Sequence, residues 1–187
     1  MSEASQPPSE YQHEPLKSEQ HIRVLRFQQS RSNGPIRFTL HQISLDGVAS
    51  ESSSYNAVSY TWASDLPDVD VLCNGQRLRV TGNCEAALRR FQNRRMRDPA
   101  KKALWIDSIC IRQNDIKERN HQVSIMGEIY EKAHCVLIWL GPSTRDTEYV
   151  FKQYRHQCSR SSYFWSLLKA LHIYVLKSPE GGDNVTL

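Results

Sequence analysis

One stretch, residues 103–141, decides the fold class; it reads ALWIDSICIRQNDIKERNHQVSIMGEIYEKAHCVLIWLG. It begins with a short apolar run, Ala103–Ile106, and ends with a longer one, Cys135–Leu140, which Gly141 and Pro142 stop. Apolar runs this short and continuous are typical of strands that are buried on both faces. A helix-length segment separates the two runs, so the stretch predicts a strand–helix–strand unit of a parallel α/β sheet.

The helix between these strands is predicted over Ile116–Ala133. Asp115 and Glu118 stand at the spacing of a capping box at its start. A second helix is expected over Thr144–Gln157. One helical face of the first is apolar at the spacings i, i+3, i+7 and i+10: Val123, Met126, Tyr130 and Ala133.

Antiparallel hairpins are predicted for the first eighty residues. Ile22–Phe27 and Ile36–Ile43 alternate between apolar and polar residues and form the first hairpin. Asp68–Val80 forms the second around Asn74-Gly75, a dipeptide that suits a type I′ turn because both of its residues must adopt positive φ. Two further elements, a central strand and a helix, are expected over Tyr55–Trp62 and Asn83–Phe91. The predicted fold class is therefore α/β, with a small mixed sheet.

The composition fits a single globular domain. The chain has 187 residues, 39% of them hydrophobic, and a formal net charge of +4. These values exclude a collagen-like, a coiled-coil and a wholly disordered chain. No apolar run approaches the ~20 residues of a membrane-spanning helix. The five cysteines form no Cys-x-x-Cys pair, so we expect buried, reduced thiols and a cytoplasmic location.

The two ends of the chain differ from its middle. The lead Met1–Gln20 is polar, is expected to be disordered or loosely draped over the domain, and lacks the features of a secretory signal. The domain is expected over residues 21–157. Residues 158–187 are expected to form a divergent amphipathic segment, Tyr163–Leu176, followed by a tail.

Polar residues are densest between the two buried strands. Asp107 follows Ala103–Ile106 directly, at the carboxyl end of a strand, where open parallel sheets bind ligands. The loop then enters a helix N-terminus, which favours anions. A purely structural role stays open, because Asp107 could pin the turn. The Cys110 thiol stands between two isoleucines, where a raised pKa and low reactivity are expected. The polar side chains that follow are Gln113, Glu118, Arg119 and Gln122.

Two further features have alternative interpretations. Tyr60 and Trp62, with Asp65 nearby, end the expected central strand and either stack on a planar ligand or close the core. The basic run Arg89–Lys102 either binds nucleic acid through counterion release or forms a solvated face. Histidines at metal-ligand spacing, a P-loop and GxGxxG, GxSxG or HExxH motifs do not occur in the sequence.

Several of these segments together resemble the heterokaryon incompatibility (HET) domain of filamentous fungi. The similar stretches follow the family's order across residues 55–141. Two positions depart from the family pattern, Ala63 in place of glycine and Arg112 in place of asparagine or aspartate. The family's later Trp- and Arg-rich segment has no counterpart after Gly141, so the domain is expected to be truncated at its C-terminus. The stretches are Tyr55–Trp62, Val80–Leu88, Leu104–Gln113, Glu118–Gln122, Met126–Tyr130 and Val136–Gly141.

The resemblance implies a role in non-self recognition and regulated cell death, exerted through protein partners or self-association. It also implies a distant similarity to Toll/interleukin-receptor-like domains, whose fold is flavodoxin-like and some of which cleave NAD with a glutamate. An NAD glycohydrolase is therefore the alternative, with NAD as substrate and no certain cofactor; a nucleic-acid-binding module is a further one. Under this resemblance the candidate catalytic residues are Glu118 and Asp107. The candidate binding residues are Tyr60, Trp62, Cys110, Gln113, Arg119 and Gln122.

Overall fold

The fold is taken from a computed structural model, which describes residues 8–28, 34–47, 54–62, 66–93, 103–141 and 173–176. Its strands are β1 (His21–Phe27), β2 (Arg37–Ser44), β3 (Tyr55–Tyr60), β4 (Val69–Cys73), β5 (Gln76–Val80), β6 (Ala103–Trp105), β7 (Cys135–Trp139) and β8 (Ile173–Leu176). Its helices are the 3-10 turn η1 (Leu45–Gly47), α1 (Gly82–Asn93), α2 (Asp107–Cys110), α3 (Ile116–Ser124) and α4 (Met126–Glu131).

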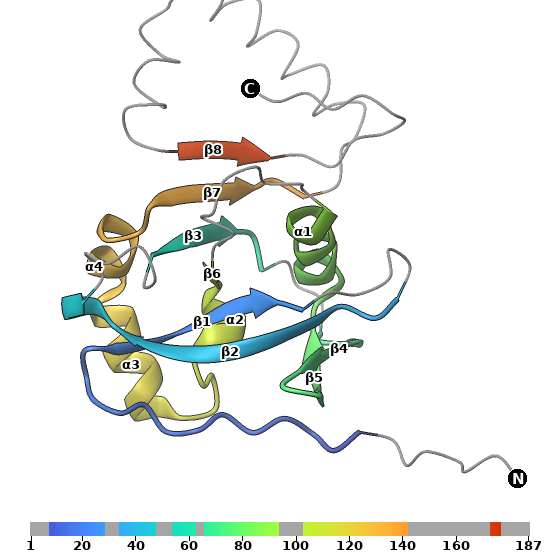
Figure 1. Ribbon diagram of the computed structural model, residues 1–187, viewed down its shortest axis with the longest axis horizontal. Coiled ribbons are helices and arrows are strands. Elements are labelled where there is room, and N and C mark those ends of the chain that lie inside the picture. Colours follow the sequence, from blue (N-terminus) through green and yellow to red (C-terminus); the bar gives the residue numbers. More distant parts are fainter. Residues whose placement is uncertain are drawn as a thin grey trace, which may run out of the picture.

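The eight strands form one mixed sheet in the order β5-β4-β2-β1-β6-β3-β7-β8 (Figure 1). The predicted α/β class with a mixed sheet is confirmed, as are both hairpins. In the first, β1 and β2 pair antiparallel along their whole length. In the second, β4 and β5 pair around Asn74 (φ 51°) and Gly75 (φ 80°), the two positive φ values that a type I′ turn requires.

The other half of the sheet is parallel. β3 pairs in parallel with β6 on one side and β7 on the other, so that Asn56 lies between Leu104 and Cys135, and β8 continues the ladder beyond β7. β3 is thus the central strand that the sequence predicted. Counted among themselves along the chain, the four parallel strands lie in the order 2-1-3-4. This is the beginning of a doubly wound order, and its switch point lies between β3 and β7.

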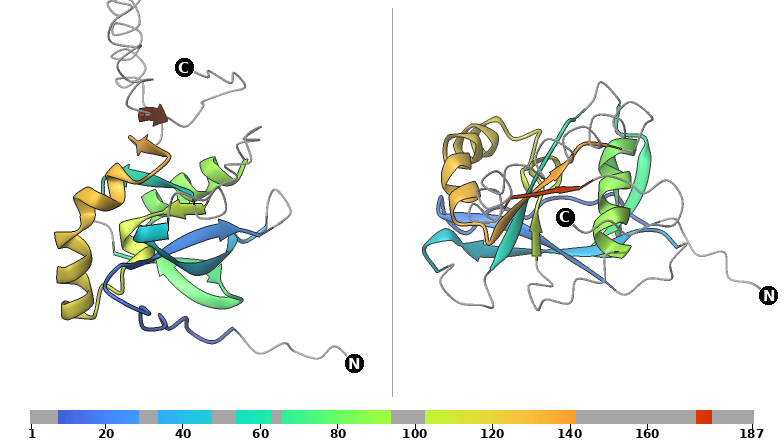
Figure 2. Two further views of the ribbon diagram at one scale, coloured as in Figure 1. Left: turned by 60° about the vertical axis from the view of Figure 1, so that its left-hand side comes forward. Right: turned by 90° about the horizontal axis from the view of Figure 1, so that it is seen from above.

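Helices cover both faces of the sheet (Figure 2). On one face, Ala87 and Leu88 of α1 pack in a core that includes Val58 and Leu137. On the other face, Ile129 of α4 packs in a second core, which includes β3 and β6 side chains. Successive residues of a strand point to opposite faces, so the short apolar strands supply both cores. Within the described ranges, none of the helices has the length and apolarity that a membrane crossing requires.

The helix predicted over Ile116–Ala133 is broken. Ile125 leaves the helical conformation (φ −97°, ψ 7°) between α3 and α4. Just before it, the Ser124 hydroxyl donates to the His121 carbonyl at 2.7 Å, a bond that competes with the backbone ladder and bends helices. The predicted apolar face assumed a straight helix. Val123 is therefore 53% exposed, while Gln122 and Ile129 are buried.

Of the two alternatives for the polar lead, the draped one describes residues 8–20, which lie against the domain. The Tyr11 amide donates to the Arg77 carbonyl and the Arg77 amide donates to the Ser9 carbonyl, each at 2.8 Å. β5 is an edge strand, and its free backbone groups are the partners that the composition of the lead does not reveal. The predicted helix Thr144–Gln157 and the tail lie outside the described residues. Of the segment 158–187, only β8 is described.

Candidate functional site

The carboxyl ends of β3 and β6 and the N-terminal turn of α1 bring polar side chains together beside the switch point, which Asn83 reaches through Trp139 of β7. We call Tyr60, Trp62, Asn83, Asp107 and Ser108 the switch-point cluster. Tyr60 and Trp62 come from the end of β3, Asp107 and Ser108 from the turn after β6, and Asn83 from α1. Doubly wound sheets bind ligands at this location.

Asp107 is the titratable centre of the cluster. Its Oδ2 accepts a hydrogen bond from the Trp62 indole at 3.0 Å, and its Oδ1 accepts one from the Ser108 amide at 2.8 Å. Burial raises the pKa of this carboxyl above its ordinary value, although both hydrogen bonds oppose the rise. The side-chain amide of Gln113 donates to the Asp107 carbonyl at 2.9 Å and holds the turn. Trp62 itself is 44% exposed, so it does not close the core.

Tyr60 lies deeper than Trp62. Its hydroxyl donates to the Ser108 hydroxyl at 2.5 Å, and the Cys84 thiol lies 3.9 Å from the same oxygen. Burial raises the pKa of Tyr60 and raises the pKa of Cys84 to about 11, so both side chains are neutral near pH 7. The hydroxyl pair can therefore donate and accept hydrogen bonds but supplies no charge.

Asn83 belongs to the cluster, although the sequence placed it only at the start of a predicted helix, where asparagine is a common capping residue. The cap of α1 is instead Thr81, whose hydroxyl accepts a hydrogen bond from the Cys84 amide at 3.2 Å. The Asn83 amide nitrogen donates to the Thr61 carbonyl at 2.7 Å, and its oxygen accepts from the Trp139 indole at 2.8 Å. One side chain thus joins β3, β7 and α1. The sequence did contain a signal for this arrangement: in Thr81-Gly82-Asn83 both the threonine and the asparagine are common capping residues, so Thr81 could cap the helix and leave Asn83 available.

Glu118 lies in a second group, the Arg23–Glu118 cluster, which also includes Arg112. Arg23 of β1 donates to both Glu118 oxygens, at 2.5 and 2.9 Å, and to the Glu14 carbonyl at 2.5 Å. The Arg112 amide adds a hydrogen bond to Glu118 at 2.8 Å. Asp115 caps α3 as expected, by accepting from the amides of residues 117 and 118. The carboxylate of Glu118 turns to Arg23 instead of completing a capping box.

These contacts decide the ionisation of Glu118. Burial alone would raise its pKa, but the hydrogen bonds from Arg23 and the Arg112 amide, together with the Arg23 charge, hold it below the usual range. Arg23 is 2% exposed and the Glu118 side chain 11%, so the pair is largely shielded from water. The two candidate catalytic carboxylates therefore differ in state. Glu118 is a paired, stabilised anion, and Asp107 is a carboxyl with an elevated pKa in a different hydrogen-bond cluster.

The remaining candidate residues are distributed around these two clusters. Cys110 is 1% exposed, and burial raises its thiol pKa to about 12, as its isoleucine neighbours predicted. Gln122 is also 1% exposed, and its amide donates to the His21 carbonyl at 3.2 Å. Arg119 is exposed. The structure thus groups Tyr60, Trp62 and Gln113 with Asp107, and places Cys110 beside Arg23 through its carbonyl, which accepts from the guanidinium at 3.0 Å.

Two observations on the described residues concern metal and nucleic-acid binding. No group of three or more His, Cys, Asp or Glu side chains that could hold a metal ion occurs among the described residues. The described cysteines are all buried: Cys73, Cys84, Cys110 and Cys135. At the start of the basic run, Arg89 pairs with Glu85 one helical turn away. Residues 94–102 of that run lie outside the described residues.

Comparison with known proteins identifies the family of the chain. The profile of the heterokaryon incompatibility protein (HET) family matches residues 55–176, more than half of the sequence. The chain belongs to the HET family. The match begins at Tyr55, as the resemblance predicted, and continues past Gly141 to include β8. The HET region contains the switch-point cluster and Glu118, whereas Arg23 and residues 8–20 precede it.

A curated relative of the HET domain is heterokaryon incompatibility protein 6, OR allele, of Neurospora crassa. The two sequences are 36% identical over 108 residues, which cover 52% of this chain and 16% of the relative. The chain therefore spans a small part of the relative's length. No solved structure matches the chain.

Proposed function

We propose that this HET domain is an effector of fungal non-self recognition that triggers regulated cell death through protein contacts. Family membership and the 36% identity to an incompatibility protein carry the proposal. A cytoplasmic location belongs to the same proposal. A flavodoxin-like fold related to Toll/interleukin-receptor-like domains belongs to the proposal, and the 2-1-3-4 order of the parallel strands supports it.

Inducible expression of the full chain in a filamentous fungus tests this role. We expect induction to reduce colony viability, and Asp107→Asn or Trp62→Ala to restore it at equal protein level. Asp70→Asn is the matched control, because Asp70 is half exposed on β4 and pairs with Arg77 and Arg79 instead of with a member of the cluster. Wild-type expression without loss of viability, at a level confirmed by immunoblot, would contradict the proposal.

An NAD glycohydrolase is the second candidate, favoured by one observation: Asp107, with its elevated pKa, lies at the carboxyl end of β6 and bonds to the exposed Trp62. In this reaction the bond between ribose C1′ and the nicotinamide nitrogen breaks, and nicotinamide leaves with the bonding electrons. Water then adds to the oxocarbenium-like ribose and loses a proton, giving ADP-ribose. A carboxylate near the ribose stabilises the developing positive charge. The position of Asp107 beside Trp62 supports this role for it, whereas Glu118 is already paired with Arg23.

Nicotinamide release at high protein concentration distinguishes the two carboxylates. If Asp107 stabilises the ribose cation, Asp107→Asn abolishes release while the protein stays folded. Glu118→Gln then lowers release only to the extent that it lowers stability, which circular dichroism measures. The reverse order of effects would assign the chemistry to Glu118, and no release from the wild-type protein would exclude the enzyme.

A further inference from the structure

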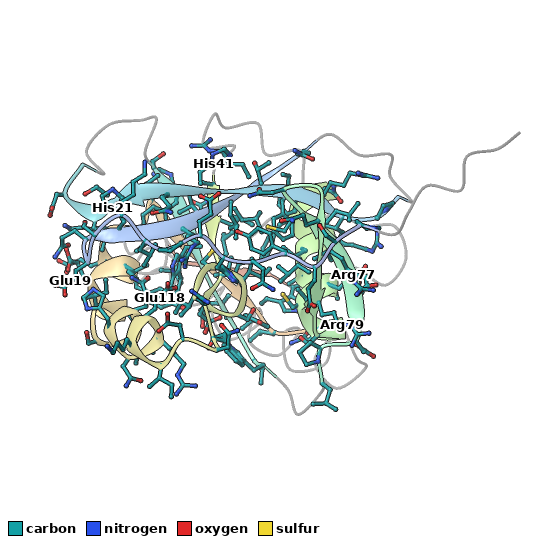
Figure 3. The ribbon with its side chains drawn as sticks, turned by 90° about the horizontal axis from the view of Figure 1, so that it is seen from below. Glu19, His21, His41, Arg77, Arg79 and Glu118 are labelled. Carbon is teal, nitrogen blue, oxygen red and sulfur yellow. The ribbon has the colours of Figure 1, made fainter. Side chains whose placement is uncertain are left out.

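Residues 8–20 cross one face of the domain, and we call them the strap. In Figure 3 the strap runs from Glu19 at the left to Arg77 at the right and passes beside Glu118. At one end the Glu19 carbonyl accepts a hydrogen bond from His121 of α3 at 2.8 Å. At the other end the strap pairs with Arg77 on the edge of β5, with Glu10 directly opposite in parallel register. The strap therefore covers the β5 edge and the Arg23–Glu118 cluster together.

The strap is held by few side chains. Tyr11 is its one buried side chain, and ten of its thirteen residues are exposed. Most of its other bonds use its backbone, as when Gln42 donates to the Pro15 carbonyl at 2.9 Å. A segment with so little apolar burial belongs to the low-stability end of a fold and opens without global unfolding.

His13 lies at the centre of the strap. Its Nε2 donates to the Ile109 carbonyl at 2.8 Å, and its ring meets the Tyr11 ring edge-on at 5.1 Å. Arg23 of β1 and Arg112 of the loop before α3 face it as cations, and Glu118 of α3 faces it as an anion. Burial, reinforced by the two arginines, lowers the pKa of His13, although the Ile109 carbonyl and Glu118 oppose the shift. Neutral His13 is thus the form that the docked strap accommodates.

We propose that the strap is an acid-sensitive autoinhibitory cover, which protonation of His13 releases from the Arg23–Glu118 cluster and the β5 edge. Release removes the Glu14 carbonyl from Arg23 and admits water to the ion pair. It also frees the amide and carbonyl of Arg77, which then lie on an unpaired sheet edge. Both surfaces become accessible to a partner in the released state. The consequence for signalling rests on the proposed effector function, whereas the release itself does not.

Proton linkage determines the direction and the upper limit of the pH effect on release of the strap. A released His13 titrates near the ordinary histidine pKa of about 6.5, and the docked one titrates lower, so the released state binds more protons below that value. Acidification from about pH 7.5 to about pH 5.5 therefore favours release, by at most about tenfold for one histidine.

Hydrogen exchange of the full chain tests the release. Protection factors, which remove the intrinsic pH dependence of exchange, are compared at these two pH values for the Tyr11 and Arg77 amides. We expect both to fall severalfold on acidification while the amides of β3 keep their protection. His13→Gln retains a neutral donor for Ile109 and abolishes the response. His13→Lys carries a permanent charge and shows low strap protection already at the higher pH.

Control variants distinguish a pH-dependent strap from a segment with a purely structural role. His41→Gln is the matched histidine control, since His41 is exposed on β2 and contacts Thr39, and it keeps the wild-type response. The proposal is overturned if His13→Gln responds like the wild type, or if β3 loses protection in parallel with the strap. In the viability assay His13→Lys is expected to be more active than His13→Gln. Equal activity, with release confirmed by exchange, would overturn autoinhibition but not the effector function.

Discussion

Arg23 donates to both carboxylate oxygens of Glu118, at 2.5 and 2.9 Å, from a side chain that is 2% exposed. Glu118 belongs to the HET region and Arg23 to the strand that precedes it. A long-range ion pair therefore joins the family region to this chain's N-terminal hairpin, at the point that the strap covers. The bidentate geometry fixes the orientation of both side chains as well as their separation.

Breaking this pair leaves a buried charge without a partner. We expect Glu118→Gln and Arg23→Met to lower the free energy of unfolding by about 3–5 kcal/mol each. Urea denaturation, followed by far-ultraviolet circular dichroism, measures the loss. Asp70→Asn removes an exposed pair to Arg77 and Arg79 and should cost less than about 1 kcal/mol. Equal losses for Glu118→Gln and Asp70→Asn would mean that the buried pair is not a structural link.

Low pH should weaken the Arg23–Glu118 ion pair over a defined pH range. Folding lowers the pKa of Glu118, so its ionised form contributes stability above the unfolded value of about 4.3. That contribution is lost as the pH falls from this value through the lower folded pKa. The difference in unfolding free energy between wild type and Glu118→Gln should accordingly narrow below about pH 4.5. A difference that stays constant down to about pH 3 would contradict the depressed pKa.

The hydrogen bond between Asn83 and Trp139 should be measurable as an energetic coupling between these two side chains. Asn83→Ala removes the hydrogen-bond partner of the Trp139 indole nitrogen, and Trp139 is only 1% exposed. The substitution should therefore lower the free energy of unfolding by about 1–3 kcal/mol. In the Trp139→Phe background the indole nitrogen is gone, so the same substitution should cost less. A double-mutant cycle by denaturation measures this difference. Additive losses would show that Asn83 acts only through the Thr61 carbonyl.

Two glycines should respond to alanine in opposite directions. Gly75 has φ +80° in the β4–β5 turn, so Gly75→Ala should destabilise by about 1–2 kcal/mol although the position is otherwise open. Gly127 lies in α4 with nothing near its missing Cβ, and Gly127→Ala should stabilise by about 0.5–1 kcal/mol. Melting temperatures of the two variants check the contrast. A stabilising Gly75→Ala would exclude the type I′ turn.

Local patterns were sufficient for much of the fold. The Asn74-Gly75 turn, the continuous apolar runs of β6 and β7, and the Asp115 cap follow from preferences that act within a few residues, and the structure confirms each. These local patterns did not predict the break between α3 and α4. Sequence periodicity locates an apolar face on a straight helix, but the break at Ile125 coincides with a side-chain hydrogen bond of Ser124 that periodicity does not reveal.

The candidate site shows the same division. Sequence position alone put Asp107 at the carboxyl end of a buried strand and Cys110 among isoleucines, because both statements concern chain neighbours. Only the tertiary structure decided that Trp62 bonds to Asp107, that Asn83 reaches Trp139, and that Glu118 is held by Arg23, 95 residues away in sequence. These pairings depend on the strand order of the sheet. Hydrophobic periodicity determines which face of each strand is buried, but it does not specify which strands become neighbours.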